Sequence, residues 1–261
     1  MTNQLPSITL KQQAILKLLY KYRFLNRIQI QILLKHKDKR RIISWLKDLR
    51  DKQYVDWHYD KTDFIAKSQP GIYYLAHNGI RYLRSLETYP SEELRKRYKE
   101  PTRTQAFTEH CLLMANCAIA LHDKSGDDVS YAVVLPGDYV NSNIAYHPLN
   151  ELKPHLYFEK EHDKRVTSYL LENIAPTLPR YQLRKRIKDY ADYLASDWGD
   201  NNRPVPISLF ICPTAADLLY VKRRVKKLLS EDWSGEEVHI RLTTLDKVQA
   251  SGVTSMIWEE V

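Results

Sequence analysis

The sequence predicts an α+β protein whose two parts differ in the spacing of their apolar residues. In the first 50 residues, apolar side chains recur at helical spacing, and two short aromatic segments with strand-like alternation follow. After residue 104, helix-like and strand-like segments alternate instead. We therefore expect a helical domain with a β-hairpin over residues 1–88, a charged linker over 89–104 and an α/β domain with a mixed sheet over 105–261.

Three helices are predicted before residue 52, and each follows a residue type that caps helix N-termini. The caps are Thr9, Asn26 and Asp38. In the second helix, the apolar residues expected to form a buried stripe are Ile28, Ile32 and Leu33. In the third helix, the residues expected to face inward are Ile42, Trp45, Leu46 and Leu49.

The two aromatic segments YVDWHYD and GIYYLAHNG predict the strands of a hairpin that follows the third helix. The order of three helices, strand, tip and strand is that of a winged helix-turn-helix, whose last helix enters the major groove of DNA. We therefore expect double-stranded DNA as the partner. The residues expected to contact it are Lys37, Lys39, Arg40, Arg41, Ser44 and Lys47 on or beside the third helix, and Lys61 and Lys67 at the wing tip.

The charge distribution agrees with this expectation. Residues 1–100 contain 21 Lys and Arg against 10 Asp and Glu, whereas the rest of the chain contains 19 against 22. The basic surface is therefore concentrated in the first hundred residues, with a net charge of +11 against −3 for the remainder. The alternative reading, in which these cations are only a solvated helix face, stays open.

Composition excludes several other classes of protein. No apolar run approaches the length of a membrane span and no signal peptide is present, so we expect a cytoplasmic protein. Cys111, Cys117 and Cys212 form no CxxC pair, which indicates buried free thiols and no metal site. With seven glycines the chain has no Gly-rich phosphate loop, and no cofactor is expected.

The second part resembles the core of PD-(D/E)xK nucleases in its order of helix, three strands, helix and strand. Over nearly its whole length the chain resembles the replication-relaxation family of bacterial mobile elements. The segments that carry this resemblance are QQAILKLLYKYRFLNRIQIQILL, GIYYLAHNGIRYL, TEH, LKPHLYFE and LLEN…RKRIKDYADYL. The resemblance implies a DNA-binding protein of a plasmid, integrated element or phage.

The residues of a nuclease site are incomplete. An active member of that fold uses a proline-acid step and an acid-x-lysine step to hold a divalent cation. Here the first step is Pro154-His155 and the second is Glu172-Asn173-Ile174, so one acid and the lysine are missing. We expect no catalytic site, and the vestigial candidates are Glu109, His155, Glu172 and Lys188.

These observations predict a sequence-specific DNA-binding protein that regulates or assists the replication, transfer or transcription of a mobile element. The degenerate second domain would then form a homodimer or dock another protein of the element. Two alternatives remain at this point: a metal-dependent nuclease or nickase with a migrated site, and a winged helix that binds protein instead of DNA.

Overall fold

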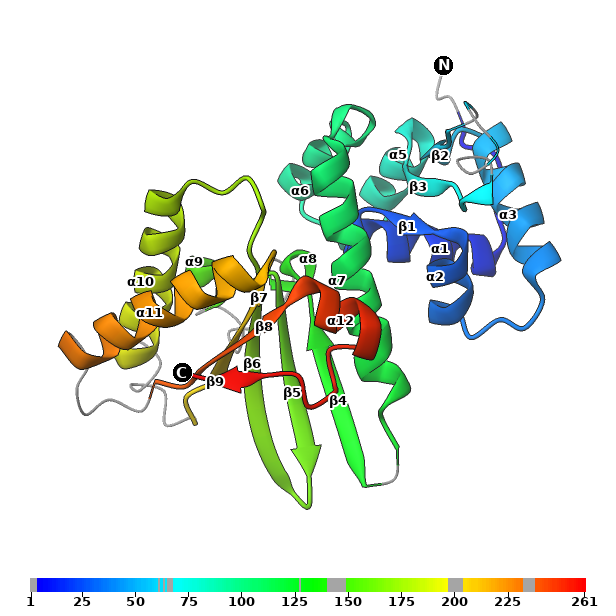
Figure 1. The fold of residues 1–261 in the computed structure, drawn as a ribbon. Coiled ribbons are helices and arrows are strands. Elements are labelled where there is room, and N and C mark those ends of the chain that lie inside the picture. Colours follow the sequence, from blue (N-terminus) through cyan, green and yellow to red (C-terminus); the bar gives the residue numbers. More distant parts are fainter. Residues whose placement is uncertain are drawn as a thin grey trace. The chain divides into compact units, whose positions relative to one another are not determined.

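The computed structural model describes residues 4–60, 62, 64, 68–126, 128–139, 149–196, 204–231 and 238–261. Its described residues divide into two compact units, residues 1–119 and 120–261 (Figure 1). Helix α7 (Gln105–Asp123) crosses this division, so the boundary falls later than the one that composition suggests. Within the described residues, no helix combines the length and the apolar character that a membrane crossing requires.

The first unit begins with three helices and a small antiparallel sheet whose strand order is β1-β3-β2. The elements are α1 (Leu10–Tyr22), β1 (Leu25–Asn26), α2 (Arg27–Leu33), α3 (Lys39–Asp51), β2 (Val55–His58) and β3 (Ile72–Leu75). The three helices and the hairpin that the sequence predicts are confirmed. Strand β1 is an addition, because two residues are too few for any alternation to show in a sequence.

All three predicted helix caps are confirmed. Thr9 and Asn26 each form a capping box with a glutamine three residues later, in which side chain and backbone satisfy each other reciprocally. The carboxylate of Asp38 accepts a hydrogen bond of 2.8 Å from the backbone N–H of Arg40. Each cap fixes where its helix starts.

The predicted buried stripe of α2 is wrong. Ile28 and Ile32 are 46% and 49% exposed, whereas Ile30 is fully buried. The side-chain amide of Gln29 is buried beside it and donates to the backbone carbonyl of Leu112 and the side chain of Asn116 on α7. Because isoleucines at alternate positions cannot all lie on one helix face, this polar anchor decides which face is buried.

Residues 89–104, which composition suggests as a charged linker, lie within the first unit. They follow α5 (His77–Ser85) and contain α6 (Ser91–Arg97) and a 3-10 turn, η1 (Glu100–Thr102). Glu100 is fully buried and receives two hydrogen bonds, of 2.8 and 3.1 Å, from the guanidinium of Arg23. Arg97 and Arg103 lie within 3.7 and 3.6 Å of the same carboxylate, and these opposite charges compensate its burial.

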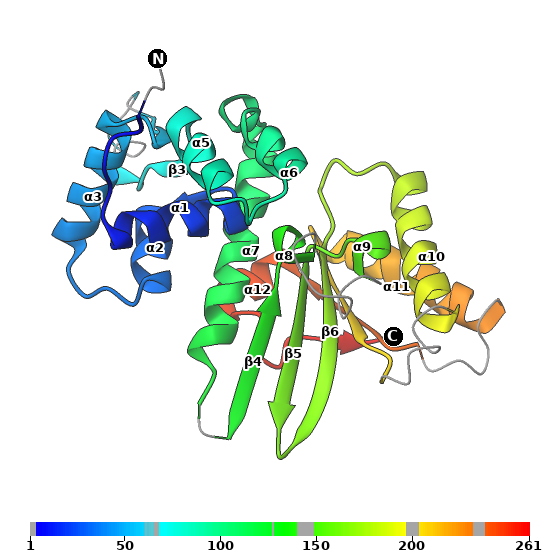
Figure 2. The ribbon, with the colours of Figure 1, turned by 180° about the vertical axis from the view of Figure 1, so that it is seen from behind.

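The second unit contains a six-stranded mixed sheet in the order β4-β5-β6-β7-β8-β9. The strands are β4 (Val129–Val134), β5 (Leu156–His162), β6 (Arg165–Asn173), β7 (Ile207–Cys212), β8 (Ile240–Thr244) and β9 (Glu259–Glu260). Strands β6, β7 and β8 are parallel neighbours and the other pairs are antiparallel. The predicted mixed sheet is therefore confirmed, and Figure 2 shows β4, β5 and β6 side by side.

Both faces of the middle strands are covered. One face supplies Leu170, Phe210 and Leu242 to an apolar core shared with two long helices, α10 (Arg180–Ser196) and α11 (Ala215–Glu231). Residues whose side chains point to the other face of the sheet, such as Leu171 and Leu209, are also buried. The short helices of this unit are α8 (Pro136–Tyr139), α9 (Leu149–Leu152) and α12 (Leu245–Ser251).

Candidate nucleic-acid interface

Helix α3 has one fully buried face. Ile42, Leu46 and Leu49 have no exposed surface, while Trp45 is half-buried and packs edge-on against the ring of His36 at 5.0 Å. Burying three large aliphatic side chains stabilises this orientation by about 1.5–3 kcal/mol each. The rotation of α3 about its own axis is therefore fixed, and the residues on the other side must face outward.

The outward face carries the predicted contact residues. At about 100° per residue, Arg40, Ser44 and Lys47 fall on one stripe opposite the buried face, and Arg41 lies roughly a quarter turn away. The exposed residues of the predicted set are Lys37, Lys39, Arg40, Arg41, Ser44 and Lys47. Lys61 and Lys67 lie outside the described residues.

The side chains of these cations form no ion pair with a described carboxylate. In the part of the chain that the structure describes, no ion pair involves Lys37, Lys39, Arg40, Arg41 or Lys47. Ile43, which the sequence analysis did not single out, lies among them and is 49% exposed. The result is a surface of unneutralised positive charge with a small apolar centre.

The vestigial acid Glu172 has a different environment. It is 6% exposed on β6, and both of its carboxylate oxygens bind the guanidinium of Arg186 on α10, each at 3.0 Å. The hydroxyl of Tyr190 donates a third hydrogen bond of 2.7 Å. Arg186 also donates to the backbone carbonyls of Leu152 and Lys153, so one side chain joins α10, β6 and the segment before β5.

His155 completes this cluster as a neutral side chain. Its Nδ1 accepts a hydrogen bond of 3.0 Å from the backbone N–H of Asn173 and lies 3.6 Å from the Glu172 carboxylate. Burial lowers the pKa of His155 below its usual 6.5, and Arg186 lowers it further, although Glu172 acts in the opposite direction. Because Nδ1 accepts this bond, the ring proton sits on Nε2.

Glu172 remains ionised despite its burial. Burial raises the pKa of its carboxyl, but the neighbouring His155 and the charge and hydrogen bonds of Arg186 and Tyr190 lower it, and the net shift is downward. Of the favourable partners we regard Arg186 as decisive, since His155 presents a lone pair to the carboxylate. The carboxylate is thus held by a guanidinium.

The other two vestigial candidates contact partners of their own. Lys188 is half exposed on α10 and pairs with Asp192 at 3.3 Å. Glu109 is exposed on α7, in the first unit, and accepts a hydrogen bond from Gln105. Sequence reasoning chose Lys188 and missed Arg186; the spacing of Arg186 and Tyr190, four residues apart on one helix face, was the signal available.

Among the described residues, no group of three or more His, Cys, Asp or Glu side chains is placed to hold a metal ion. The three cysteines are free and buried, as predicted, and burial raises the pKa of each thiol to about 12. These thiols are therefore protonated and unreactive near neutral pH.

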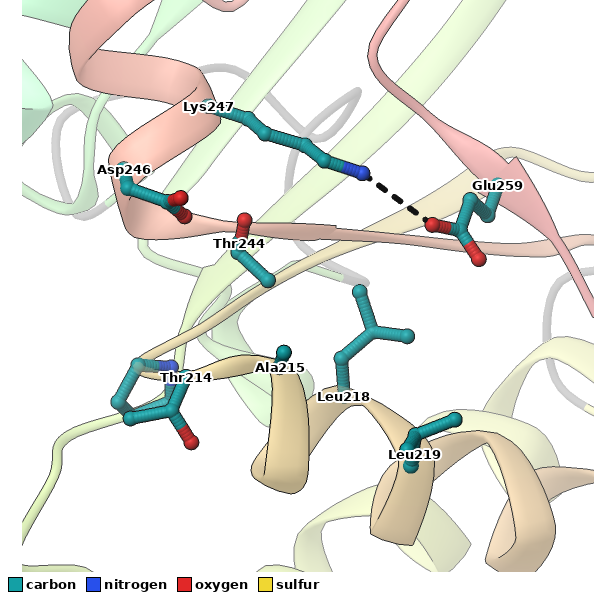
Figure 3. A pocket seen from close by; sticks show the side chains of 9 residues that line it. Thr214, Ala215, Leu218, Leu219, Thr244, Asp246, Lys247 and Glu259 are labelled. Atoms are coloured by element: carbon teal, nitrogen blue, oxygen red, sulfur yellow. Dashed lines mark hydrogen bonds and ion pairs between the residues drawn. The ribbon is translucent and has the colours of Figure 1, made fainter.

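A hollow of about 390 Å³ lies where β7 and β8 end (Figure 3). Its lining includes the first turns of α11 and α12, and its Lys247 pairs with Glu259 at 3.3 Å across the opening. None of the residues singled out in the sequence lines this hollow. It is separate from the Glu172 cluster in its residues and supplies that cluster with no further group.

The sequence pattern of the replication-relaxation family matches residues 16–205. Among curated proteins none matches. Two solved structures of the restriction endonuclease FokI are similar: one bound to DNA, at 12% identity and a TM-score of 0.30, and a second at 12% identity and 0.33.

Both FokI matches cover 93% of this chain but only 44% and 43% of the FokI chain. The chain therefore spans less than half the length of the solved proteins it matches. TM-scores this low do not establish a common fold.

Proposed function

Since the chain belongs to the replication-relaxation family, we propose that it is a mobile-element protein that binds double-stranded DNA with sequence specificity through α3. Binding would regulate or assist the replication, transfer or transcription of the element. The observation that carries this proposal is the two-sided character of α3. Its aliphatic face is fully buried, and its opposite face presents exposed cations that pair with no carboxylate in the described part of the chain.

The order of elements in the first unit supports a winged helix-turn-helix. In that motif the helix after the turn enters the major groove, and the hairpin that follows lies along the flanking backbone. Helix α3 occupies the first of these positions, and β2 with β3 occupies the second. A helix with its side chains is about 10–12 Å wide, which matches a major groove of about 12 Å.

Each outward side chain suits a different kind of DNA contact. Arg40 and Lys47 can donate to guanine edges or phosphates, and the hydroxyl of Ser44 can donate or accept. The exposed apolar side chain of Ile43 suits the methyl group of thymine. Lys37, Lys39 and Arg41 flank this stripe and suit phosphates, and Lys61 and Lys67 belong to the same proposal at the wing tip.

The second unit is proposed to hold a second copy of the chain or another protein of the element. Its Glu172 supports a structural role, because Arg186 engages both carboxylate oxygens that a divalent cation would need. The mass of the protein in solution, measured by light scattering at several concentrations, distinguishes a homodimer from a monomer that awaits a different partner.

The DNA-binding proposal is tested in two steps. A duplex site is first selected from a random pool with the wild-type protein, and its affinity is then measured by gel shift at physiological salt. Arg40→Ala and Lys47→Ala should each weaken binding by about 1–3 kcal/mol. Lys17→Ala on α1 removes the same charge from an exposed position outside α3 and serves as the control.

Two results would overturn the proposal. Affinities of the α3 variants equal to that of the Lys17→Ala control would remove α3 as the reading helix. A wild-type protein that selects no duplex and shows no salt-sensitive retention on heparin would favour a winged helix that binds protein.

A further inference from the structure

Arg50, in the last turn of α3, lies over the face of an aromatic ring. Its guanidinium carbon is 3.9 Å from the ring centroid of Trp57 on β2, a distance at which the cation is attracted to the face of the indole. The planar guanidinium can stack in this way while its edges still point donors outward, which a lysine cannot do. Arg50 is therefore placed by a contact that does not neutralise its charge.

Trp57 is itself held from several sides. The ring of Tyr59 stacks on it with centroids 4.7 Å apart, and the ring of Tyr73 lies at 5.6 Å. Gly71 provides the remaining space, because a Cβ atom at that position would come within 2.5 Å of the indole. These contacts hold the indole ring in place beneath the guanidinium.

Unlike Arg23 and Arg186, Arg50 forms no ion pair with a carboxylate among the described residues. Arg23, with its side chain 23% exposed, binds Glu100, and Arg186, at 24%, binds Glu172. Within the described residues no carboxylate pairs with Arg50. Its buried Nε has no hydrogen-bond partner among the described residues.

The position of Arg50 places it at the edge of the α3 surface. It follows Lys47 by three residues, or about 4.5 Å along the helix axis, on the side of α3 that faces β2. A charged group with donors, fixed in place and without a counter-ion, suits an anion supplied from outside the protein.

We propose that Arg50 is a phosphate-binding residue that Trp57 holds in position for contact with the DNA backbone. This inference rests on the proposed DNA binding by α3 and adds a contact that the sequence analysis did not predict. A purely structural alternative exists, in which Arg50 only joins α3 to β2, and the two differ in what salt does to binding.

The test measures DNA affinity as a function of salt for four variants on the selected duplex. Loss of one phosphate contact lowers the slope of log affinity against log salt by about 0.9, so Arg50→Ala should have the shallower slope. Trp57→Leu keeps the charge of Arg50 but removes the indole ring that positions it. This variant should bind about two- to fivefold more weakly, with the wild-type slope retained. Arg50→Lys keeps the positive charge but removes the planar guanidinium that packs on Trp57. Arg84→Ala removes an exposed arginine on α5 and serves as the control.

The outcomes separate the inference from the function on which it rests. A wild-type protein without salt-sensitive DNA binding overturns the proposed function itself. A wild-type protein that binds, with Arg50→Ala showing the wild-type slope, overturns only the role of Arg50. Circular dichroism and thermal unfolding identify variants that fail to fold; if Trp57→Leu is one of them, Trp57→Phe, which keeps a smaller ring, replaces it.

Discussion

Helix α3 and helix α10 both carry arginines at their partly or fully exposed positions, but the two helices use them differently. Arg40 on α3 is exposed and has no carboxylate partner among the described residues. Arg186 on α10 is three-quarters covered and makes a bidentate ion pair with Glu172 together with two backbone contacts. The same residue type is thus a candidate for recognition in one unit and a part of the core in the other.

The difference shows that a run of basic residues has no function by itself. What matters is whether the fold supplies the counter-ion. Glu172 is brought to Arg186 by the packing of α10 on β6, whereas α3 faces solvent on the side where its cations lie. An unneutralised cluster favours binding of an external polyanion such as DNA.

The largest expected effect comes from breaking the buried pair. Arg186→Ala leaves the Glu172 carboxylate buried without its principal partner, so the free energy of unfolding should fall by about 3–5 kcal/mol. Denaturant unfolding at neutral pH measures this change. Arg184→Ala, two residues away and exposed, is the matched control and should change the stability by no more than about 0.5 kcal/mol. Equal effects of the two substitutions would show that the ion pair contributes nothing specific.

A smaller effect is expected from pH. The pKa of His155 is lower in the fold than its ordinary value of 6.5, so the unfolded chain binds a proton first as the pH falls. The stability that neutral His155 contributes is present above pH 6.5 and is lost as the pH falls through its folded pKa. His155→Gln can still accept the Asn173 N–H and does not titrate, so its unfolding free energy should vary less between pH 7.5 and 5.5. An unchanged pH dependence would contradict the neutral state of His155 in the fold.

Glu172 contributes in a lower window. The pKa of its carboxyl is depressed, so its contribution is present above about 4.5 and is lost as the pH falls further. His155→Gln should therefore still lose unfolding free energy in acid, and this loss should occur below pH 4.5.

No effect at all is expected in a cleavage assay. Supercoiled plasmid incubated with purified protein and Mg²⁺ or Mn²⁺ should stay intact, because the guanidinium of Arg186 already engages both oxygens of Glu172. Nicking that disappears in Glu172→Ala would place a catalytic cation at this cluster and contradict the structural role assigned to it.

The elements with strong periodicity were predictable from the sequence. The three N-terminal caps form as expected, and the third helix buries Ile42, Leu46 and Leu49 as its apolar spacing indicates. The two-residue strands and α12 were not predictable, because short segments carry too little periodicity to distinguish them from loops.

The misreadings have a common physical cause. The buried face of α2 is set by hydrogen bonds of Gln29 to α7, which lie more than 80 residues away in sequence. Residues 89–104 resemble a solvated linker in composition, yet Glu100 is buried by arginines that include the distant Arg23. Arg186 was missed because Arg186 on α10 and Glu172 on β6 come together only in the fold. Polar groups satisfied by distant partners leave only a weak local pattern, such as the four-residue spacing of Arg186 and Tyr190.

The most direct measurement for the central claim is a site-specific cross-link. Ser44→Cys puts a thiol on the outward stripe of α3, and the native thiols do not compete, because burial raises the pKa of all three to about 12. A selected duplex with an activated disulfide tether on a major-groove base edge should form a protein–DNA disulfide with Ser44→Cys and not with Ser85→Cys on α5. Binding of the duplex with no cross-link at Ser44→Cys, or with equal cross-linking at Ser85→Cys, would contradict the placement of α3 in the groove.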